Sequence, residues 1–542
     1  MIIPSNVRTD TKMMNKMRNM KYNKEYRKHS LSLSLALVLS LALVACSDAW
    51  DAHYDPKDVQ RAGTKTLWEE ISARSELRAF CEVLTTTGYD KLLDGDQMLT
   101  IFAPKGALTT DGLSRSQLAT EIVENHVARL PISASTMLQT PVSVHMLNDK
   151  ICHFAYDGKG YTFADTPVVE QNIIARNGVL HIIGQEVPFF CNVWEFMDKD
   201  TVYSSIRNYL YSFDEQVLDE RSSVPGAIVD GQITYVDSVV INTNEMFYRI
   251  GYLNDEDSIY WMVLPTNTAW SKGYAKVSSY YNYSQKNQHR DSLQRHYTQL
   301  AMVRDLVFSQ TMQHAPVDSL VSTGKGVFYD PLQTLLPEYS RYEDGTQCSN
   351  GIVFPVDTLR YRPWESWHRS IEVEAENTRG REYTLCELYK RTLNASSPYY
   401  SRVSSASYVE TSPTTSSSNP TVTFSIPDVL SAKYDIKAVF LPQSLGTDKA
   451  NYHRPNKIVC NLTSVDAMGK TVTVKSDNIL TDPERIDTVT LFSGYTFESC
   501  NYDEETVSTK LRVQSQVLSK ERSDYSRTLL IDCVLFEPSK DE

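Results

Sequence analysis

One pattern constrains the fold of this chain most, and it occurs twice. It is a short apolar strand that ends in proline, followed far downstream by an Asn-Gly pair and another apolar strand. The first strand is Met98–Pro104, the second ends at Pro265, and the pairs begin at Asn177 and Asn350. Proline cannot continue a strand ladder, so the chain leaves the sheet there. Asn-Gly favours a tight reversal. The prolines are 161 residues apart and the pairs 173 apart, which predicts a tandem repeat of one α+β plan with insertions.

Helical periodicity precedes each strand in both copies. From Leu67, apolar residues recur at steps of mostly three and four until Gly88, which we expect to end a helix. A second helix is expected to carry Leu118, Ile122 and His126 before Pro131. The stretch from Val193 to Phe213 echoes the first helix and opens the second copy.

Three motifs stand in the order of those of the fasciclin domain: Thr100–Pro104, Asn125-His126-Val127 and Asn177–Ile183. Residues 64–190 therefore resemble a fasciclin domain. Residues 191–369 resemble a divergent second unit, because Arg304-Asp305-Leu306-Val307 replaces the histidine motif. The resemblance implies cell adhesion, or contact with matrix or glycans. We expect the ring nitrogens of His126 to bond backbone groups rather than a ligand.

From residue 370 the apolar residues alternate along short segments separated by Ser, Thr and Pro. This pattern predicts a β-sandwich of jelly-roll-like type over residues 370–542. It is similar to carbohydrate-binding jelly rolls, and a generic sandwich is the alternative. The Ser/Thr/Pro-rich stretch from Glu410 to Pro420 is predicted to be a mobile loop.

The N-terminus has the order of a secretory signal. A basic segment is followed by the apolar run Leu31–Val44, which at about 14 residues is shorter than the roughly 20 of a membrane-spanning helix. Leu43-Val44-Ala45-Cys46 resembles the lipobox of bacterial lipoproteins, and the serine and acidic residues after it resemble a Bacteroidota surface-export signal. We predict a signal peptide over 1–45, lipidation at Cys46, a tether over 46–63 and an outer-membrane, cell-surface location, with the periplasmic face as the alternative.

Charge and cysteine content limit the partners. Without residues 1–45 the chain has 46 basic and 65 acidic residues, a net charge of −19, and we expect no nucleic-acid partner. Eight further cysteines could pair in an oxidising compartment or stay as buried thiols.

The motifs of the common enzyme classes, GxSxG, HExxH, the Walker loop and GxGxxG, do not occur. We predict no enzyme, no catalytic residue, no cofactor and no metal site. His145, Cys152 and His153 would not converge on an ion, because Cys152 and His153 point to opposite faces of a strand. Glu372, Glu374 and Glu376 share one strand face and are interpreted as a solvated edge, with a calcium site as the alternative.

Tyrosines of the C-terminal region are the predicted ligand-binding residues, because aromatic rings can stack on sugars. The candidates are Tyr399, Tyr400, Tyr408 and Tyr452, beside His453. Ordinary packing is the alternative for each. We therefore predict a membrane-anchored surface protein that binds glycan or matrix protein. The alternatives are a structural accessory subunit of an outer-membrane glycan transporter and, third, a hydrolase with paired carboxylates.

Overall fold

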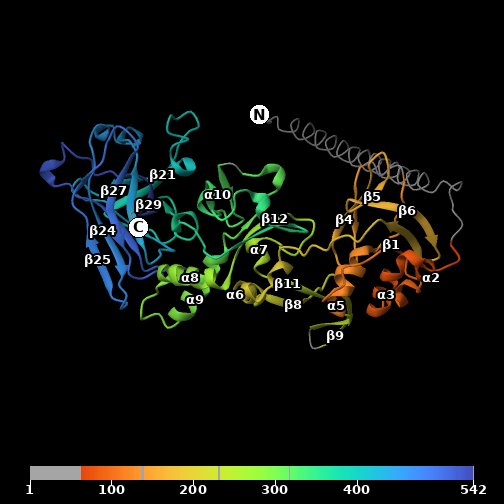
Figure 1. The fold of residues 1–542 in the computed structure, drawn as a ribbon. Helices are drawn as coiled ribbons and strands as arrows, with labels where there is room; N and C mark the ends of the chain where they lie inside the picture. The colour runs from red at the N-terminus through yellow and green to blue at the C-terminus, as the bar shows by residue number, and fades with distance from the viewer. Residues whose placement is uncertain (1–62, 136–139, 230–231, 317, 541–542) are drawn as a thin grey trace, which may run out of the picture. The chain divides into compact units, whose positions relative to one another are not determined.

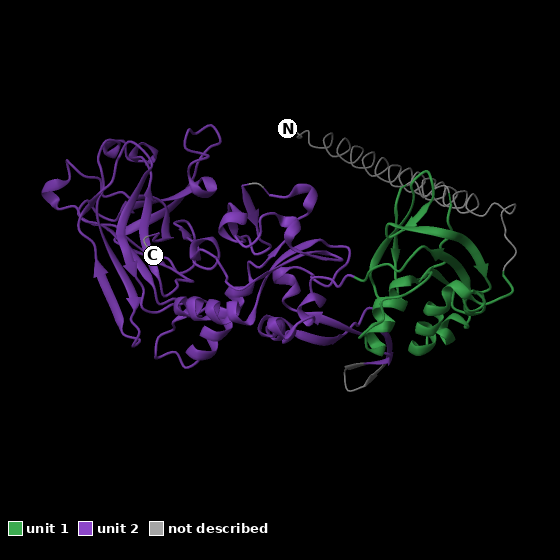
Figure 2. Cartoon of the chain, viewed as in Figure 1, with its two compact units in different colours: residues 1–189 green, residues 190–542 purple. Residues whose placement is uncertain are grey.

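The computed structural model of the protein describes residues 63–135, 140–229, 232–316 and 318–540 (Figure 1). The chain divides into two compact units, one up to residue 189 and one from residue 190 (Figure 2). None of the helices in these described ranges is long and apolar enough to cross a membrane. The predicted signal peptide, Cys46 and nearly all of the tether lie outside the described residues.

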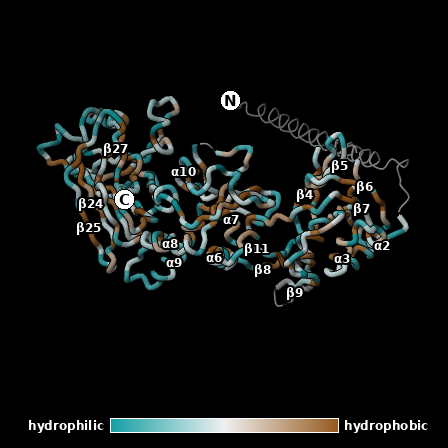
Figure 3. The backbone as a smooth tube through the Cα atoms, viewed as in Figure 1, coloured by the Kyte–Doolittle hydropathy of each residue, from teal (hydrophilic) through white to brown (hydrophobic). Residues whose placement is uncertain are grey.

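The first unit is built on a mixed seven-stranded sheet with the order β2-β1-β7-β6-β5-β4-β3. The central strands β1 and β7 are buried at every residue, and the hydrophobic end of the colour scale follows buried strands such as β7 (Figure 3). The strands are β1 (Leu99–Pro104), β2 (Val127–Ala128), β3 (Val142–His145), β4 (Ile151–Tyr156), β5 (Tyr161–Phe163), β6 (Thr166–Ala175) and β7 (Gly178–Ile183).

Short helical segments pack on this sheet in place of the two continuous helices that the sequence predicts. Arg74 has an extended backbone, which separates the first helix into two, while Gly88 ends it in the left-handed region as predicted. The segment that carries His126 is a run of π and 3-10 turns. The segments are α2 (Leu67–Ser72), η1 (Ser75–Leu77), α3 (Arg78–Thr87), α4 (Asp90–Leu93), α5 (Arg115–Gln117), η2 (Leu118–Val123) and η3 (Glu124–His126).

The second unit begins with a four-stranded sheet, β13-β12-β17-β16, and three two-stranded ribbons, β8–β11, β9–β10 and β14–β15. Its strands are β8 (Asp214–Leu218), β9 (Val224–Val229), β10 (Gln232–Asp237), β11 (Val240–Asn244), β12 (Tyr260–Pro265), β13 (Val307–Phe308), β14 (Ser319–Val321), β15 (Val327–Tyr329), β16 (Thr346–Cys348) and β17 (Gly351–Val356). Its helical segments include η4 (Glu195–Asp198), η5 (Thr201–Tyr203), α6 (Ser204–Tyr211), α7 (Phe247–Ile250), α8 (Asn267–Val277), η6 (Ser278–Tyr281), α9 (Arg290–Val303) and α10 (Pro331–Thr334).

The central strand pairs of the two sheets share one register. Strand β1 runs parallel to β7 with Leu99 opposite Gly178, and β12 runs parallel to β17 with Tyr260 opposite Gly351. Both glycines have φ near +150°, and a Cβ on either would lie within about 2 Å of the carbonyl oxygen of the opposite residue. Each Asn-Gly pair therefore needs glycine because two backbones approach closely there.

The buried asparagines before these glycines bond alike. The side chain of Asn177 accepts from the Leu67 amide and donates to the carbonyls of Leu93 and Gly95. The side chain of Asn350 accepts from the Val193 amide and donates to the carbonyls of Leu253 and Asp255. In each sheet the asparagine ties the entering segment, a loop and the closing strand together.

The rest of the second unit is strand-rich, as the sequence predicts, and forms two antiparallel six-stranded sheets. The first contains β18 (Ile371–Glu374), β20 (Cys386–Thr392), β21 (Ser407–Pro413), β23 (Lys433–Phe440), β27 (Asp487–Thr496) and β29 (Leu530–Pro538). The second contains β19 (Glu382–Thr384), β22 (Thr421–Ser425), β24 (Lys457–Val465), β25 (Thr471–Lys475), β26 (Ile479–Leu480) and β28 (Lys510–Ser515). The predicted loop from Glu410 is wrong at its start, because Glu410 is buried in β21 and pairs with Arg391 at 2.7 Å.

Candidate ligand-binding site

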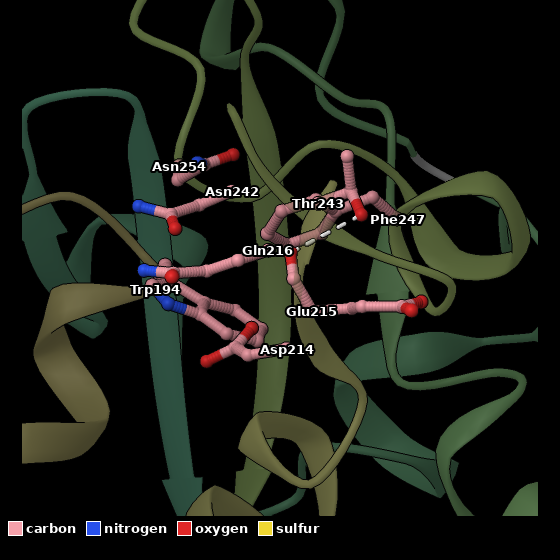
Figure 4. A pocket seen from close by; sticks show the side chains of 8 residues that line it. All are labelled: Trp194, Asp214, Glu215, Gln216, Asn242, Thr243, Phe247 and Asn254. Carbon is pink, nitrogen blue, oxygen red and sulfur yellow. Dashed lines mark hydrogen bonds between the residues drawn. The ribbon is translucent and has the colours of Figure 1, made fainter. Parts of the chain in front are cut away.

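A cleft of about 410 Å³ opens beside the ribbon β8–β11 in the second unit (Figure 4). Side chains from the segment before η4, both ribbon strands, the start of α7 and the following loop line it. They are Trp194, Asp214, Glu215, Gln216, Asn242, Thr243, Phe247 and Asn254.

Trp194 forms the aromatic floor of the cleft. Its indole stacks on the ring of Tyr211 with centroids 4.5 Å apart and meets Phe247 edge-on at 4.9 Å. Only 8% of Trp194 is exposed, so these two rings hold the indole in one orientation. A fixed aromatic group costs a ligand little conformational entropy when the two meet.

The polar wall follows from the register of the ribbon. Gln216 lies opposite Asn242, and Asp214 lies opposite Asn244. Because directly opposed residues of an antiparallel pair share a face and neighbours alternate, Asp214, Gln216 and Asn242 project to one side. Figure 4 shows these three side chains beside Trp194, with Glu215 and Thr243 directed away from them.

Three amide side chains of the cleft have no hydrogen bond to the described part of the protein: those of Gln216, Asn242 and Asn254. All three are exposed. Each amide offers both a donor and an acceptor, as a sugar hydroxyl does. Asp214 receives a hydrogen bond from Asn244 at 2.7 Å and adds an acceptor. The arrangement suits a neutral, hydroxyl-rich ligand that contacts the exposed part of the Trp194 indole and bonds to the amides.

The cleft does not have the carboxylate pair of a glycoside hydrolase. Asp214 and Glu215 are adjacent on β8, so their side chains project to opposite faces of the ribbon. One carboxylate among amides can bind and orient a sugar, but it does not supply the acid and the base that flank a scissile bond.

A second cavity of about 290 Å³ lies between α7, α9 and the loop after β27 that carries Tyr502. It is lined by Arg249, Tyr281, Tyr297, Arg304 and Tyr502, among others. Arg249 pairs with Glu245 at 2.7 Å, Arg304 lies 3.8 Å from a carboxylate oxygen of Asp305, and the Tyr297 hydroxyl donates to Asp503. Because these groups already bond within the protein, the cleft at Trp194 is the better candidate.

The predicted tyrosines do not form one binding surface. Tyr408 is only 4% exposed, lies in an apolar cluster with Val403 and Leu530, and donates its hydroxyl to the Leu445 carbonyl at 2.8 Å. Its predicted role in stacking on a sugar is therefore wrong, because its ring is in the core. Tyr399 packs against the same cluster.

The other two predicted tyrosines are more accessible. Tyr400 is 44% exposed, and Tyr452 is half-buried beside His453, whose ring bonds to Glu484. Tyr400 is thus the predicted residue that remains most available for stacking in the C-terminal region.

His126 bonds backbone groups at both ring nitrogens, which confirms the sequence prediction. Nδ1 donates to the Ile122 carbonyl at 2.6 Å, and Nε2 accepts from the Val187 amide at 3.0 Å. Burial lowers the pKa of His126 to about 4, so the ring is neutral at physiological pH. Asn125, beside it, donates to the Val187 carbonyl at 3.2 Å. The motif therefore fastens the end of the domain and is not a ligand site.

The two groups of residues for which the sequence argues against a metal site have different environments in the structure. Cys152 is buried and His153 exposed on β4, so they face opposite ways, as expected. Within the described ranges no three His, Cys, Asp or Glu residues have the spacing of a metal site. On β18 Glu372 is exposed, as the predicted solvated edge requires, whereas Glu374 and Glu376 are half-buried. Each of these two has one carboxylate oxygen that is shielded and without a hydrogen-bond partner in the described part of the chain, as does Asp532. Burial raises the pKa of Asp532 to about 7, and the charges of the neighbouring glutamates add to this effect.

The comparison with protein families agrees with the three motifs and with the sheet that they build. The Fasciclin domain family matches residues 75–186. These residues form a Fasciclin domain. The match covers β1, the His126 segment and β7, which are the parts that carry the motifs.

Among solved structures, the chain is similar to a FAS1 domain pair from the insect cell adhesion molecule Fasciclin I, with 14% identity, a TM-score of 0.21, and 54% of this chain and 98% of that chain covered. It is also similar to the C-terminal family 22 carbohydrate-binding module of Clostridium thermocellum Xyn10B, with 12% identity, a TM-score of 0.20, and coverage of 32% and 94%. A further similar structure is the CBM22-1 xylan-binding domain from Paenibacillus barcinonensis Xyn10C, with 13% identity, a TM-score of 0.20, and 32% of this chain and 94% of that chain covered. A comparison with curated proteins gave no match.

Sequence reasoning missed the polar residues of the cleft. Gln216 and Asn242 stand in exposed polar segments that look like any solvated surface, and only the pairing of β8 with β11 brings them together. The one local signal was Trp194, an aromatic residue at the start of the second copy, which the sequence pattern assigns to helix packing.

Proposed function

We propose that this protein is an exported lipoprotein, lipidated at Cys46 and held on the cell surface, that binds neutral glycans through the cleft at Trp194. The observation that carries the proposal is the set of three unpaired amides beside a fixed aromatic floor. Aromatic contact with hydrogen bonds to a few placed polar groups is the usual chemistry of a small-ligand site. Without residues 1–45 the net charge is −19, which favours a neutral ligand over an anionic one.

We also propose that residues 191–369 are a second, divergent fasciclin-like unit. The shared register of β1–β7 and β12–β17 supports this, as do the matching bonds of Asn177 and Asn350. A tandem pair with a strand-rich C-terminal region suits adhesion to a matrix or glycan better than catalysis, and we propose no enzymatic activity.

The test is titration calorimetry of residues 47–542 with neutral oligosaccharides, chosen from a glycan array probed with the same protein. Gln216→Ala combined with Asn242→Ala should weaken binding about tenfold or more, because two hydrogen-bonding groups are lost. The exposed Asn394→Ala is the matched control and should bind as the parent protein does.

Two outcomes would overturn the assignment. If Tyr400→Ala abolishes binding while the cleft variant binds normally, recognition lies in the C-terminal region. If no glycan binds, the alternative function is favoured, that of an accessory subunit that docks on an outer-membrane transporter. Lipidation is tested separately, by incorporation of labelled palmitate in cells that express the parent chain or Cys46→Ala.

A further inference from the structure

We propose that Cys191 and Cys348 form a disulfide in the first part of the second unit, between the segment that enters the unit and the β16–β17 hairpin. The proposal rests on export to an oxidising compartment, which is part of the proposed function. It concerns two residues that the glycan cleft does not use.

The backbones around the two cysteines are fastened together. The Ser349 amide donates to the Cys191 carbonyl at 3.0 Å, and two residues further the Val193 amide donates to the side chain of Asn350 at 2.8 Å. Cys348 ends β16 and lies opposite Gly351 across the turn into β17. The two cysteines are 4% and 2% exposed, and their thiols are hydrogen-bonded to each other. Adjacent backbones, and thiols close enough to share a hydrogen bond, are what a disulfide needs to form without a large backbone movement.

The first unit supplies an internal comparison. There the Arg176 amide donates to the Lys65 carbonyl at 2.7 Å, and the Leu67 amide donates to Asn177 at 2.8 Å. Lys65 and Ala175 thus occupy the positions of Cys191 and Cys348, and Ala175 also lies opposite its glycine, Gly178. The same backbone contact exists in both units, but only the second carries a cysteine on each side of it.

The environment of Cys191 favours the thiolate, which is the form that reacts. The hydrogen bond from Cys348, and to a smaller extent the ammonium group of Lys199, lower the pKa of Cys191 to about 7. Other buried thiols show the opposite effect, since burial raises the pKa of Cys460 and Cys500 to about 12. Near neutral pH, Cys191 is therefore far better prepared to react than Cys460 or Cys500.

The reaction balances as ordinary thiol–disulfide exchange. The Cys191 thiolate attacks one sulfur of a small-molecule or protein disulfide, which releases the first thiolate and leaves a mixed disulfide. Deprotonated Cys348 then attacks the Cys191 sulfur and releases the second thiolate of the oxidant. Two thiols are oxidised, the oxidant's disulfide is reduced, and the two protons pass to water or to the departing thiolates.

The test uses residues 47–542, purified reduced and then equilibrated in a glutathione disulfide and glutathione buffer. This step needs no export, so its outcome is independent of the proposed location. Unpaired thiols are alkylated under denaturing, non-reducing conditions, and peptides are mapped by mass. A peptide that links Cys191 to Cys348 is expected. Alkylation of both residues, or a different partner for either one, would overturn the proposal.

Thermal unfolding gives a second readout. Oxidation should raise the Tm of the parent protein by about 10 °C, because the disulfide links residues that are 157 positions apart in the sequence. Cys191→Ser, Cys348→Ser and the double variant should show no rise on oxidation. Cys460→Ser, which removes a buried thiol elsewhere, should keep the rise. Equal Tm values for the oxidised and reduced parent protein would count against a stabilising bridge even if the linked peptide formed.

Discussion

Asp305 occupies in the second sheet the position that Asn125 occupies in the first. Each stands two residues before the short strand that pairs with the central strand, since Val127 lies opposite Ile101 and Val307 opposite Met262. Asn125 bonds the backbone of its own domain, whereas the fully buried Asp305 accepts hydrogen bonds from Ser322, Gly326, Ser366 and Arg369. The second sheet therefore has a buried, charged aspartate with several hydrogen bonds where the first has a neutral asparagine.

Asp305→Asn should destabilise the second unit by about 2–3 kcal/mol. The amide cannot neutralise the half-buried guanidinium of Arg369, and its nitrogen meets donors where an acceptor is needed. Urea unfolding followed by tryptophan fluorescence measures the change. The exposed Asp318→Asn should stay within about 0.5 kcal/mol of the parent protein. Equal losses for the two variants would show that the cluster contributes no special stability.

The Fasciclin domain should lose stability in mild acid. Burial lowers the pKa of His126 and of His181 to about 4, below the usual value of about 6.5. The unfolded chain takes up protons below pH 6.5 that the folded domain refuses, so stability falls from pH 6.5 towards pH 4, by up to about 3 kcal/mol per histidine.

Thermal unfolding from pH 7 to pH 4.5 measures this fall in stability. His126→Gln lowers stability at pH 7 because a backbone bond is lost, but its pH dependence should be shallower than that of the parent protein. The exposed His153→Gln should keep the full slope. A parent protein with a flat profile would show that the buried rings do not govern acid stability.

Sequence patterns predicted the parts of this fold that local chemistry dictates. Three such parts are the strand that ends at Pro104, the closing strand that begins at Gly178 and the helix cap at Gly88. Each depends on one proline or glycine, whose backbone conformational preferences follow from the residue type alone. The break at Arg74 could not be seen, because the apolar steps continue across it and the packing of α2 and α3 decides it.

The candidate site could not be predicted from the sequence for a related reason. Gln216 and Asn242 gain meaning only from long-range pairing, and Tyr408 was misplaced because a buried and an exposed tyrosine look alike in sequence. His126 was predicted correctly, because a histidine in a known motif at the end of a short helical segment has few polar partners except the backbone.

Asp532→Asn should stabilise the second unit at neutral pH and not in acid. The raised pKa of about 7 means that the folded state resists ionisation of this carboxyl group, so the cost begins as pH rises above about 4 and is complete above pH 7. The asparagine carries no charge and can still accept from the Ser404 amide. The expected gain is about 1–2 kcal/mol at pH 7.5 and nothing near pH 4, by denaturant titration at both values. The exposed Asp477→Asn should change neither.

A chain cut after residue 369 should not keep a stable second unit, although the sequence predicts a domain boundary there. The Ser431 amide donates to the Tyr280 carbonyl at 2.8 Å, the Cys500 amide donates to the Asn282 carbonyl at 2.9 Å, and the Tyr283 hydroxyl donates to the Tyr502 carbonyl at 2.9 Å. Tyr281 and Tyr283 are 2% and 3% exposed, so removal of the C-terminal sheets would bare both rings.

We therefore expect residues 47–369 to bind a hydrophobic dye, to aggregate and to lose the cooperative transition of the second unit in calorimetry, while residues 47–189 unfold cooperatively on their own. A truncated protein with an intact second transition would contradict this and restore residue 369 as a true boundary. If the prediction holds, loss of glycan binding on truncation cannot locate the site, because the cleft at Trp194 belongs to the unit that the cut destabilises. Point variants such as Gln216→Ala keep that unit whole and decide where the ligand binds.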